Sequence, residues 1–309
     1  MNVKNAKHLV IDCYSLIYPA FYTTNNLYCR SGSGVMSSGI AYGFLNKLLA
    51  LAKRFNSNRV YFCWDHHESY RKKAYSEYKQ NRDKLTEEEQ LDRIDLHKQV
   101  DNLRIDILPS MGFRNHFRCS GFEADDLIAK LVSLLNNIYE KEYIVVISTD
   151  KDLFQLLDRC NLFNPSSNKL MTQKIFENTY GIKVDQWVDC KAIGGCDSDN
   201  VKGIKGVADP AKSVTYNGVV FKLVRGEMKN GVVLKRVNSK EGIEIIERNL
   251  PLVTCPYPRA KMKAIITRRD HCSRSKFIKV FDRYAFRSQL EDARFKEWER
   301  IFTQKKEAK

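Results

Sequence analysis

The chain of 309 residues is 43% hydrophobic and 29% charged, which excludes long disorder and allows one large core or two smaller ones. Its formal net charge of +15 predicts a positive surface field and nominates nucleic acid as a partner, with a merely soluble basic protein as the alternative. The nine cysteines form no Cys-x-x-Cys pair and no zinc-ligand spacing, so we expect a protein of a reducing cytoplasm. The N-terminus lacks a signal-peptide layout, and no apolar run approaches ~18 residues, so we expect no membrane span.

Short apolar runs alternate with helical patterns in the first half of the chain. Residues 8–11, 60–64 and 144–147 have the length and the β-branched or aromatic content of buried strands, and each run leads into an aspartate. Apolar residues recur at helical spacing over residues 40–55 and 125–139. This alternation predicts βαβ units and an α/β fold with a mostly parallel sheet flanked by helices.

Residues 66–120 interrupt the alternation and predict a helical insertion after a strand. A basic stretch that begins with Arg71, Lys72 and Lys73 precedes an acidic stretch that begins at residue 86. Tyr78 and two other tyrosines lie among these cations, a mixture that can hold phosphates and stack on bases. A solvated amphipathic helix is the alternative.

Glycines punctuate residues 194–208, where a tight hairpin between helices would let backbone amides approach a phosphate. An ordinary connecting loop is the alternative. Farther along the chain, residues 219–237 favour strands or irregular structure, and residues 276–309 favour a charged helical tail.

Acidic residues gather where the predicted strands end. Because ligands of open parallel sheets bind beyond the carboxyl ends of the strands, we expect Asp12, Asp65 and Asp150 to converge on one crevice. Each acid alone is explained as a helix or turn cap, but like charges gathered in one crevice raise each other's pKa unless cations neutralise them. Further acids lie at the start of the next helix, two residues beyond Asp150 and in the glycine-rich loop: Glu123, Asp125, Asp126, Asp152, Asp197 and Asp199.

The predicted cluster of carboxylates favours hard divalent cations. Oxygen ligands select magnesium or manganese over zinc, and two such ions can polarise a phosphodiester, generate hydroxide from bound water and stabilise the leaving oxygen. The sequence offers no convincing Ser-His-Asp or Cys-His set and no GxxxxGK[ST] phosphate loop. The residues therefore favour metal-dependent hydrolysis of nucleic acid over chemistry at a nucleophilic side chain.

Short motifs spread over residues 8–208 resemble those of the 5′-nuclease family, which includes flap endonucleases, bacteriophage 5′-to-3′ exonucleases and the 5′-nuclease domain of bacterial DNA polymerase I. They stand in the family's order: residues 10–12 (VID), 63–65 (CWD), 77–82 (EYKQNR), 121–126 (GFEADD), 148–152 (STDKD) and 199–206 (DNVKGIKG). The resemblance implies a PIN-like sheet, a helical arch over the site and a helix-three-turn-helix that binds duplex backbone. It divides the chain into a catalytic domain at residues 1–190, with the arch at about 66–120, and a DNA-binding region with a C-terminal extension at residues 191–309.

The resemblance also implies roles for individual residues. Lys79 and Arg82 match the arch cations, which would contact the scissile phosphate and stabilise its developing charge. The first metal site would be formed by Glu123, Asp125, Asp126 and Asp150, lined by Asp12 and Asp65, and the second would be served by Asp152 and Asp199. Contacts to nucleic acid are expected from Arg71, Lys72, Lys73, Tyr78, Gly203, Lys205 and Gly206. The expected cofactors are two Mg²⁺ ions, for which Mn²⁺ would substitute.

Two departures from the family pattern affect these expectations. In the family's Gly-Asp-x-x-Asp-Asn pattern, Cys196 takes the place of the first aspartate, and Asp197 follows one residue later. Either Asp197 reaches the metal from a shifted loop, or the second site lacks one ligand. Ala208 stands where the hairpin usually has a third glycine, which would alter the backbone grip on a duplex.

The function implied by the resemblance is that of a structure-specific 5′-to-3′ exonuclease and flap endonuclease, which removes primers or flaps during replication in a bacterial or phage-infected cytoplasm. The expected partner is DNA or an RNA–DNA hybrid with a 5′ end, flap or nick. We expect a monomer, with replication proteins as further partners. Two alternatives stay open: a nucleic-acid-binding relative with weakened catalysis, suggested by Cys196 and the altered hairpin, and a PIN-type ribonuclease, which would lack the arch and the hairpin.

Overall fold

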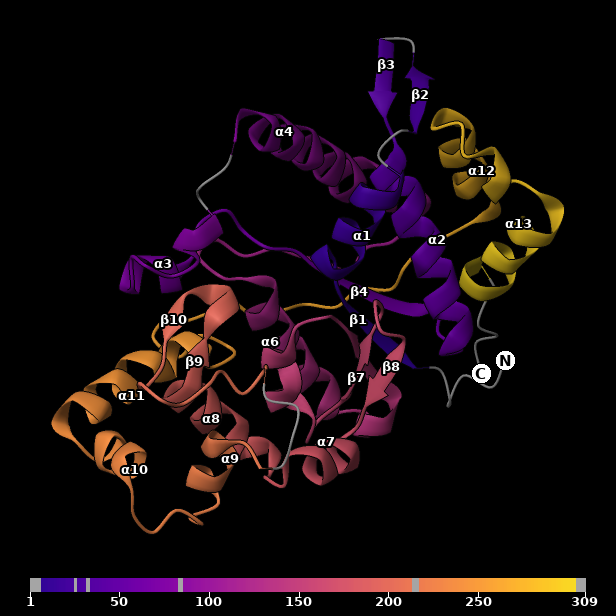
Figure 1. The fold of residues 1–309 in the computed structure, drawn as a ribbon. Helices are drawn as coiled ribbons and strands as arrows, with labels where there is room; N and C mark the ends of the chain where they lie inside the picture. Colours follow the sequence, from indigo (N-terminus) through magenta and orange to yellow (C-terminus); the bar gives the residue numbers. More distant parts are fainter. Residues whose placement is uncertain (1–6, 25–26, 32–33, 83–85, 213–216, 304–309) are drawn as a thin grey trace.

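A six-stranded sheet forms the centre of the computed structural model, which describes residues 7–24, 27–31, 34–82, 86–212 and 217–303 (Figure 1). The strand order is β5-β4-β1-β6-β7-β8, with β1 (His8–Asp12), β4 (Arg59–Cys63), β5 (His116–Phe117), β6 (Ile144–Ile147), β7 (Asn161–Asn164) and β8 (Lys169–Met171). Neighbouring strands are parallel except β7 and β8. The predicted α/β fold with a mostly parallel sheet is confirmed.

The strands predicted from the sequence are the central ones. β1 pairs with β4 on one side, where His8 lies opposite Arg59, and with β6 on the other, where His8 lies opposite Ile144. Side chains of β1 alternate between the faces, so Leu9 and Ile11 lie in one hydrophobic core and the residue between them lies in the other. Because these strands run in the same direction, their carboxyl ends meet at one edge of the sheet.

Helices cover both faces of the sheet. α1 (Tyr14–Thr24) and α2 (Gly39–Arg54) pack in one core, and α6 (Ala124–Asn136) and α7 (Gln173–Tyr180) belong to the core on the opposite face. α2 and α6 confirm the helices predicted at residues 40–55 and 125–139. An antiparallel hairpin of β2 (Tyr28–Ser31) and β3 (Gly34–Ser37) projects between α1 and α2 (Figure 1). Short helical turns complete the connections: Lys141–Tyr143, Lys151–Leu156, Val184–Gln186 and Asp197–Asp199.

The insertion predicted at residues 66–120 is helical. It contains α3 (Tyr70–Ala74), a turn at Gln80–Arg82, and α4 (Glu87–Asn102), which continues through a π-helical segment (Leu103–Ile107) into α5 (Leu108–Met111). A capping box, in which the Thr86 and Glu89 side chains satisfy each other's backbone N–H groups, starts α4. Residues 83–85 of the insertion lie outside the described residues.

Residues 187–253 form a second group of short helices around a small hairpin. They comprise α8 (Trp187–Gly194), the hairpin strands β9 (Gly195–Cys196) and β10 (Val201–Lys202), α9 (Val219–Val224), α10 (Val232–Val237) and α11 (Lys240–Val253). The prediction of strands or irregular structure at residues 219–237 holds only for residues 225–231 and is wrong for the two short helices on either side. Valines favour strands, but Val220 and Phe221 are buried in a core shared with α8, and this packing outweighs the local preference.

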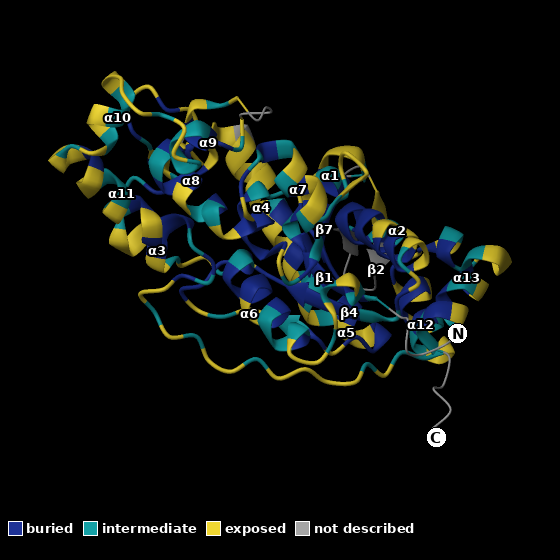
Figure 2. Cartoon of the chain, turned by 90° about the horizontal axis from the view of Figure 1, so that it is seen from below, coloured by how far each residue is buried: buried dark blue, intermediate teal, exposed yellow. Residues whose placement is uncertain are grey.

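The C-terminal part of the chain returns to the sheet. Residues 261–273 have no regular structure and form a long loop (Figure 2), which lies next to the edge strand β5. Asn115 fastens this segment, since its side chain both donates to and accepts from the backbone of Arg268, each at 2.8 Å. The edge of the sheet is thereby covered.

The C-terminal helices pack against the hydrophobic core that contains α1 and α2. α12 (Arg274–Arg283) and α13 (Asp292–Trp298), with turns at Arg287–Gln289 and Glu299–Thr303, pack in the same core as α2. The helical tail predicted at residues 276–309 is therefore confirmed as far as residue 303, and residues 304–309 lie outside the described part. The predicted division at residue 190 does not coincide with a boundary of this core. Within the described ranges, no helix is long and apolar enough to cross a membrane.

Candidate active site

Acidic residues from separate segments line one cavity at the carboxyl edge of the sheet. Asp12 ends β1, Asp65 follows β4, Asp150 follows β6 and Asp125 lies in the first turn of α6. All four line a cavity of about 630 Å³, together with Lys79 and other residues of the predicted arch. The structure thus brings together acids that are far apart in the sequence.

Hydrogen bonds fix the positions of these carboxylates. Ser15 Oγ and Ser148 Oγ donate to Asp12 Oδ2 at 2.6 and 2.8 Å. The backbone N–H of Ala124 donates to Asp65 Oδ1 at 2.7 Å, which joins the start of α6 to the end of β4. Neither serine was singled out from the sequence, because Ser15 and Ser148 belong to no pattern beyond their proximity to an aspartate.

The four acids differ in exposure but share an unneutralised charge: Asp12 is buried, Asp125 and Asp150 are half-buried, and Asp65 is exposed. Burial raises the pKa of Asp65 to about 6 and that of Asp150 to about 7, with nearby acids adding to the rise. Burial also raises the pKa of Asp12, and burial followed by the charge of Asp150 raises that of Asp125 well above its usual value. None of the four forms an ion pair with a lysine or arginine among the described residues. Carboxylate oxygens are the ligands that hard divalent cations prefer, although no three ligand atoms of these four acids lie within 4.8 Å of one another in this structure.

Glu123 differs from the other acids because cations already hold it. Burial acts to raise its pKa, but Lys79 and Arg71 outweigh burial and lower the pKa to about 2. Lys79 Nζ lies 2.8 Å from Glu123 Oε2, and the Tyr78 hydroxyl donates to the same oxygen at 2.9 Å. Glu123 therefore positions the ammonium of Lys79 at the cavity wall. Tyr78 is 2% exposed and turns its hydroxyl inward to Glu123, and its contact with nucleic acid stays a prediction.

Arg71 and Asp126 form an internal ion pair. The guanidinium donates to both Asp126 oxygens at 2.7 Å and to the carbonyl of Thr254 at 2.8 Å. Asp126 is fully buried and also accepts from the backbone N–H groups of Glu123 and Tyr257. Arg71 and Asp126 thus satisfy each other in this structure, and a metal ligand at Asp126 and a nucleic-acid contact at Arg71 stay predictions. Sequence alone could not show which cation of the basic stretch turns inward.

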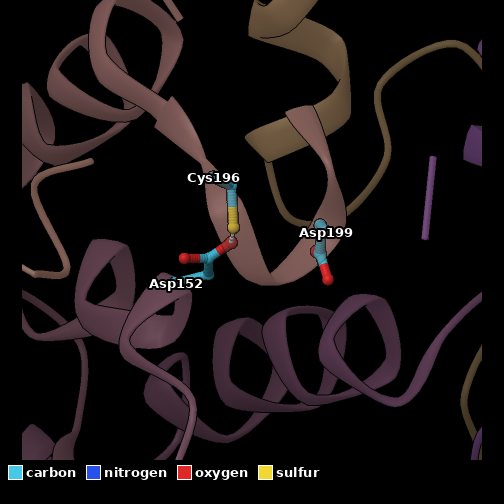
Figure 3. A group of neighbouring side chains, drawn as sticks. All are labelled: Asp152, Cys196 and Asp199. Carbon is cyan, nitrogen blue, oxygen red and sulfur yellow. Dashed lines mark hydrogen bonds between the residues drawn. The ribbon is translucent and has the colours of Figure 1, made fainter. Parts of the chain in front are cut away.

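A second cluster lies beside the first, because the backbone N–H of Asp152 donates to Asp150 Oδ1 at 2.7 Å. One possible ligand atom each from Asp152, Cys196 and Asp199 lie within 4.8 Å of one another (Figure 3). Lys191 Nζ, almost fully buried, lies 2.8 Å from Asp152 Oδ1. Arg82 donates to Asp199 Oδ1 at 2.9 Å. Lys191 was missed in the sequence, although its burial between Cys190 and Ala192 departs from the usual exposure of lysine.

Asp197 does not join this cluster. It is exposed and lies 2.5 Å from Lys212 Nζ, while Cys196 faces the acids. The structure therefore favours the alternative in which the second site lacks the oxygen ligand of Asp197, and a metal ligand at Asp197 stays a prediction.

The predicted nucleic-acid contacts separate into surface and packing residues. Lys72, Lys73, Lys205 and Gly206 are exposed, and Lys73 lies 2.9 Å from a carboxylate oxygen of Glu68. A Cβ atom at Gly203 would lie 2.2 Å from the carbonyl carbon of the residue that ends α8. Gly203 is therefore required for backbone packing within the hairpin.

A row of tyrosines was also missed. Tyr14, Tyr18 and Tyr22 follow at four-residue spacing on α1 and line the cavity beside the acids. Their spacing, directly after Asp12, is the signal that could have revealed them.

Comparison with known proteins agrees with this geometry. Residues 7–181 match the family model described as the 5′-3′ exonuclease N-terminal, resolvase-like domain. The chain belongs to the 5′-3′ exonuclease family. The 5′-3′ exonuclease of Bacillus subtilis is 31% identical over 215 residues, which cover 67% of this chain and 68% of that protein. DNA polymerase I of Thermus thermophilus is 29% identical over 203 residues, which cover only 22% of the polymerase.

Solved structures of the bacteriophage T5 D15 protein share the fold of this 5′-3′ exonuclease family member. One, co-crystallised with metal ions, has a TM-score of 0.64 at 22% identity and covers 80% of this chain and 89% of that chain. Another, the T5 D15 flap endonuclease in a complex with DNA and metal ions, has a TM-score of 0.62 at 24% identity. These structures share the mostly parallel sheet of this chain. The residues beside the carboxyl edge of the sheet that could hold a metal ion are Asp152, Cys196 and Asp199.

Proposed function

We propose that the protein is a structure-specific 5′-to-3′ exonuclease and flap endonuclease, which hydrolyses phosphodiester bonds near the 5′ ends of DNA or of RNA–DNA hybrids. The observation that carries this proposal is the convergence of Asp12, Asp65, Asp125 and Asp150 on one cavity without a cationic partner among the described residues. Removal of primers or flaps in replication is the corresponding role.

The same acids would hold the cofactor. Asp12, Asp65, Asp125 and Asp150 offer hard oxygen ligands for Mg²⁺, with Mn²⁺ as a substitute, and Asp152 and Asp199 would serve a second divalent ion. Bound divalent cations supply Lewis-acid polarisation of the phosphodiester and a reactive hydroxide from water.

Side chains around the acids would bind and orient the substrate. Lys79 and Arg82 line the cavity. Their positive charges would contact the scissile phosphate and stabilise the negative charge that develops on it during hydrolysis. Glu123 holds Lys79 in place at 2.8 Å. The rings of Tyr18 and Tyr22, which are 49% and 77% exposed, offer stacking surfaces for bases near the site.

The flanking regions would hold the rest of the substrate. We assign residues 66–120 to an arch over the cavity within a catalytic domain at residues 1–190, and the hairpin around Lys205 and Gly206 to a helix-three-turn-helix contact with duplex backbone. The T5 flap endonuclease complex with DNA supports a nucleic-acid partner. We expect the protein to act as a monomer, together with replication proteins, in a bacterial or phage-infected cytoplasm.

Cleavage of a 5′-labelled flap duplex tests this function. With Mg²⁺ or Mn²⁺ we expect short labelled products whose length reports the cleavage position, and with chelator we expect none. Binding of the flap without product would instead identify a family member with weakened catalysis. Preference for single-stranded RNA over the flap duplex would identify a PIN-type ribonuclease.

A further inference from the structure

The second cluster differs from the first because it contains sulfur. Cys196 is 1% exposed, and its Sγ lies 3.7 Å from Asp152 Oδ2, to which the thiol donates. In Figure 3 the sulfur points from the hairpin toward the Asp152 carboxylate, with Asp199 on the same hairpin. Among the described residues, this is the one group of acids and cysteines whose ligand atoms lie within 4.8 Å of one another.

Neighbouring residues hold each donor in place. Cys196 pairs with Val201 in the β9–β10 hairpin, which fixes the direction of its side chain. Lys191 Nζ lies 2.8 Å from Asp152 Oδ1 and so leaves Oδ2 facing the sulfur. The Tyr78 hydroxyl donates to Asp199 Oδ2 at 3.0 Å. The donors are therefore positioned before any ligand arrives.

The separation between the sulfur of Cys196 and an oxygen of Asp152 matches a tetrahedral metal, and Asp199 offers a ligand atom within 4.8 Å of both residues. Zinc–sulfur and zinc–oxygen bonds of about 2.3 and 2.1 Å at a tetrahedral angle separate the two donor atoms by roughly 3.6 Å. The observed separation between Cys196 Sγ and Asp152 Oδ2 is 3.7 Å. Three protein ligands leave a fourth position open for water or a phosphate oxygen.

We propose that Asp152, Cys196 and Asp199 form a mixed thiolate–carboxylate site that binds a borderline-soft divalent cation, such as Zn²⁺ or Co²⁺, in preference to Mg²⁺. Thiolate ligands favour such cations, whereas Mg²⁺ requires oxygen ligands, and a coordinating thiol loses its proton to the bound metal. This inference builds on the proposed nuclease, since it places two cation positions of different chemistry in one active centre. The all-oxygen cluster takes the hard ion and the sulfur-containing cluster takes the softer one.

Cobalt absorption tests the site without any nucleic acid. Titration of the metal-free full-length protein with Co²⁺ should produce a sulfur-to-cobalt charge-transfer band in the near ultraviolet. Cys196→Ser should abolish the band. Cys119→Ser is the control and should leave the band unchanged; its thiol is more exposed than that of Cys196 and would bind added Co²⁺ first if accessibility alone decided binding. Zn²⁺ should displace Co²⁺ and quench the band, whereas excess Mg²⁺ should not.

Variants with altered ligands make the outcome decisive. Cys196→Asp replaces the sulfur ligand by oxygen, so the charge-transfer band should disappear. Its Zn²⁺ affinity should fall by more than ~10–100-fold, which is the usual loss when a residue that only hydrogen-bonds to a metal ligand is changed. Should Cys196→Ser fail to fold, Asp199→Asn serves instead and should weaken cobalt binding by a similar factor. A wild-type protein without the band, or a band that persists in folded Cys196→Ser, overturns the proposal. Because no substrate is present, either result is independent of whether the flap duplex is cleaved.

Discussion

Asp65 and Asp150 make the stability of the metal-free protein depend on pH in an unusual direction. Burial raises their pKa values to about 6 and about 7, whereas both carboxyls titrate near ~4 in an unfolded chain. Between about pH 4 and 7 the folded protein therefore holds more protons than the unfolded chain. The contribution of these acids to stability is present at low pH and is lost as pH rises through this window.

Urea unfolding of chelator-treated protein at a series of pH values measures this effect. We expect the free energy of unfolding to fall less steeply with rising pH in Asp150→Asn than in the wild type, because the variant lacks one of the raised carboxyls. Saturating Mg²⁺ should remove the difference in slope, since a bound cation keeps the carboxylates ionised. Identical slopes for the two metal-free proteins would contradict the assigned pKa of Asp150.

The pair of Arg71 and Asp126 predicts a loss of stability on substitution. Arg71→Met leaves the fully buried carboxylate of Asp126 without its partner, and breaking a buried pair in this way costs about 3–5 kcal/mol. Lys72→Met on the exposed side of α3 is the matched control and should change stability by less than ~1 kcal/mol. Urea unfolding of both variants checks the prediction; equal stability would show that the pair is dispensable.

Individual residues show what the sequence could not reveal about the site. The aspartates that end parallel strands were predictable, because strand direction alone brings Asp12, Asp65 and Asp150 to one edge. The directions of Arg71 and Tyr78 were not, because a charged stretch gives no sign of which side chains the fold encloses. Burial of these two residues depends on contacts with residues more than a hundred positions away.

The hairpin of β9 and β10 tolerates little change at Gly203. A Cβ atom there would lie 2.2 Å from a backbone carbon of α8, and such overpacking against rigid backbone should cost about 3 kcal/mol or more. We expect Gly203→Ala to weaken binding of a flap duplex, measured by fluorescence anisotropy, because the hairpin moves. Gly226→Ala meets no atom within 4 Å, and the strain at its φ of +72° stays in an exposed turn, so this variant should lose some stability but keep its duplex affinity. Equal duplex affinities for the two variants would show that the hairpin does not contribute to duplex binding.

Secondary structure was predictable where pattern and packing agree. The central strands and the helices α2 and α6 follow from apolar periodicity, since the same residues that set the period fill the core. The short helices α9 and α10 were not predictable, because their valines favour strands and only packing decides the outcome: α9 packs on α8, and α10 packs on α11. The insertion of residues 66–120 was recognisable as helical, although its π-helical segment carried no signal.

The C-terminal helices complete the core that holds the sheet. Trp298 is fully buried, and its ring lies 5.5 Å from that of Phe277 in the core shared with α2. Trp298→Ala should lower the free energy of unfolding by about 3–5 kcal/mol, whereas Ile266→Ala at an exposed position should have little effect. A single cooperative unfolding transition by urea, shifted in the first variant alone, is the expected result. An unshifted transition for Trp298→Ala would mean that the C-terminal helices fold separately.

The overall organisation was only partly visible in the sequence. Motifs over residues 8–208 predicted the sheet and its crevice. The predicted domain division at residue 190 was based only on the order of these motifs along the chain. The structure shows that helices beyond residue 274 return to the first core, a contact between distant segments that no local pattern encodes.

Matched aspartate substitutions test the central claim that the acids of the cavity hold the cations for phosphodiester hydrolysis. Asp125 lines the cavity, whereas Asp197 is exposed and paired with Lys212. With Mg²⁺ and a 5′-labelled flap duplex, Asp125→Asn should reduce the cleavage rate by at least about a thousandfold while the protein stays folded. Asp197→Asn should cleave as the wild type does. Undiminished cleavage by folded Asp125→Asn would contradict the account.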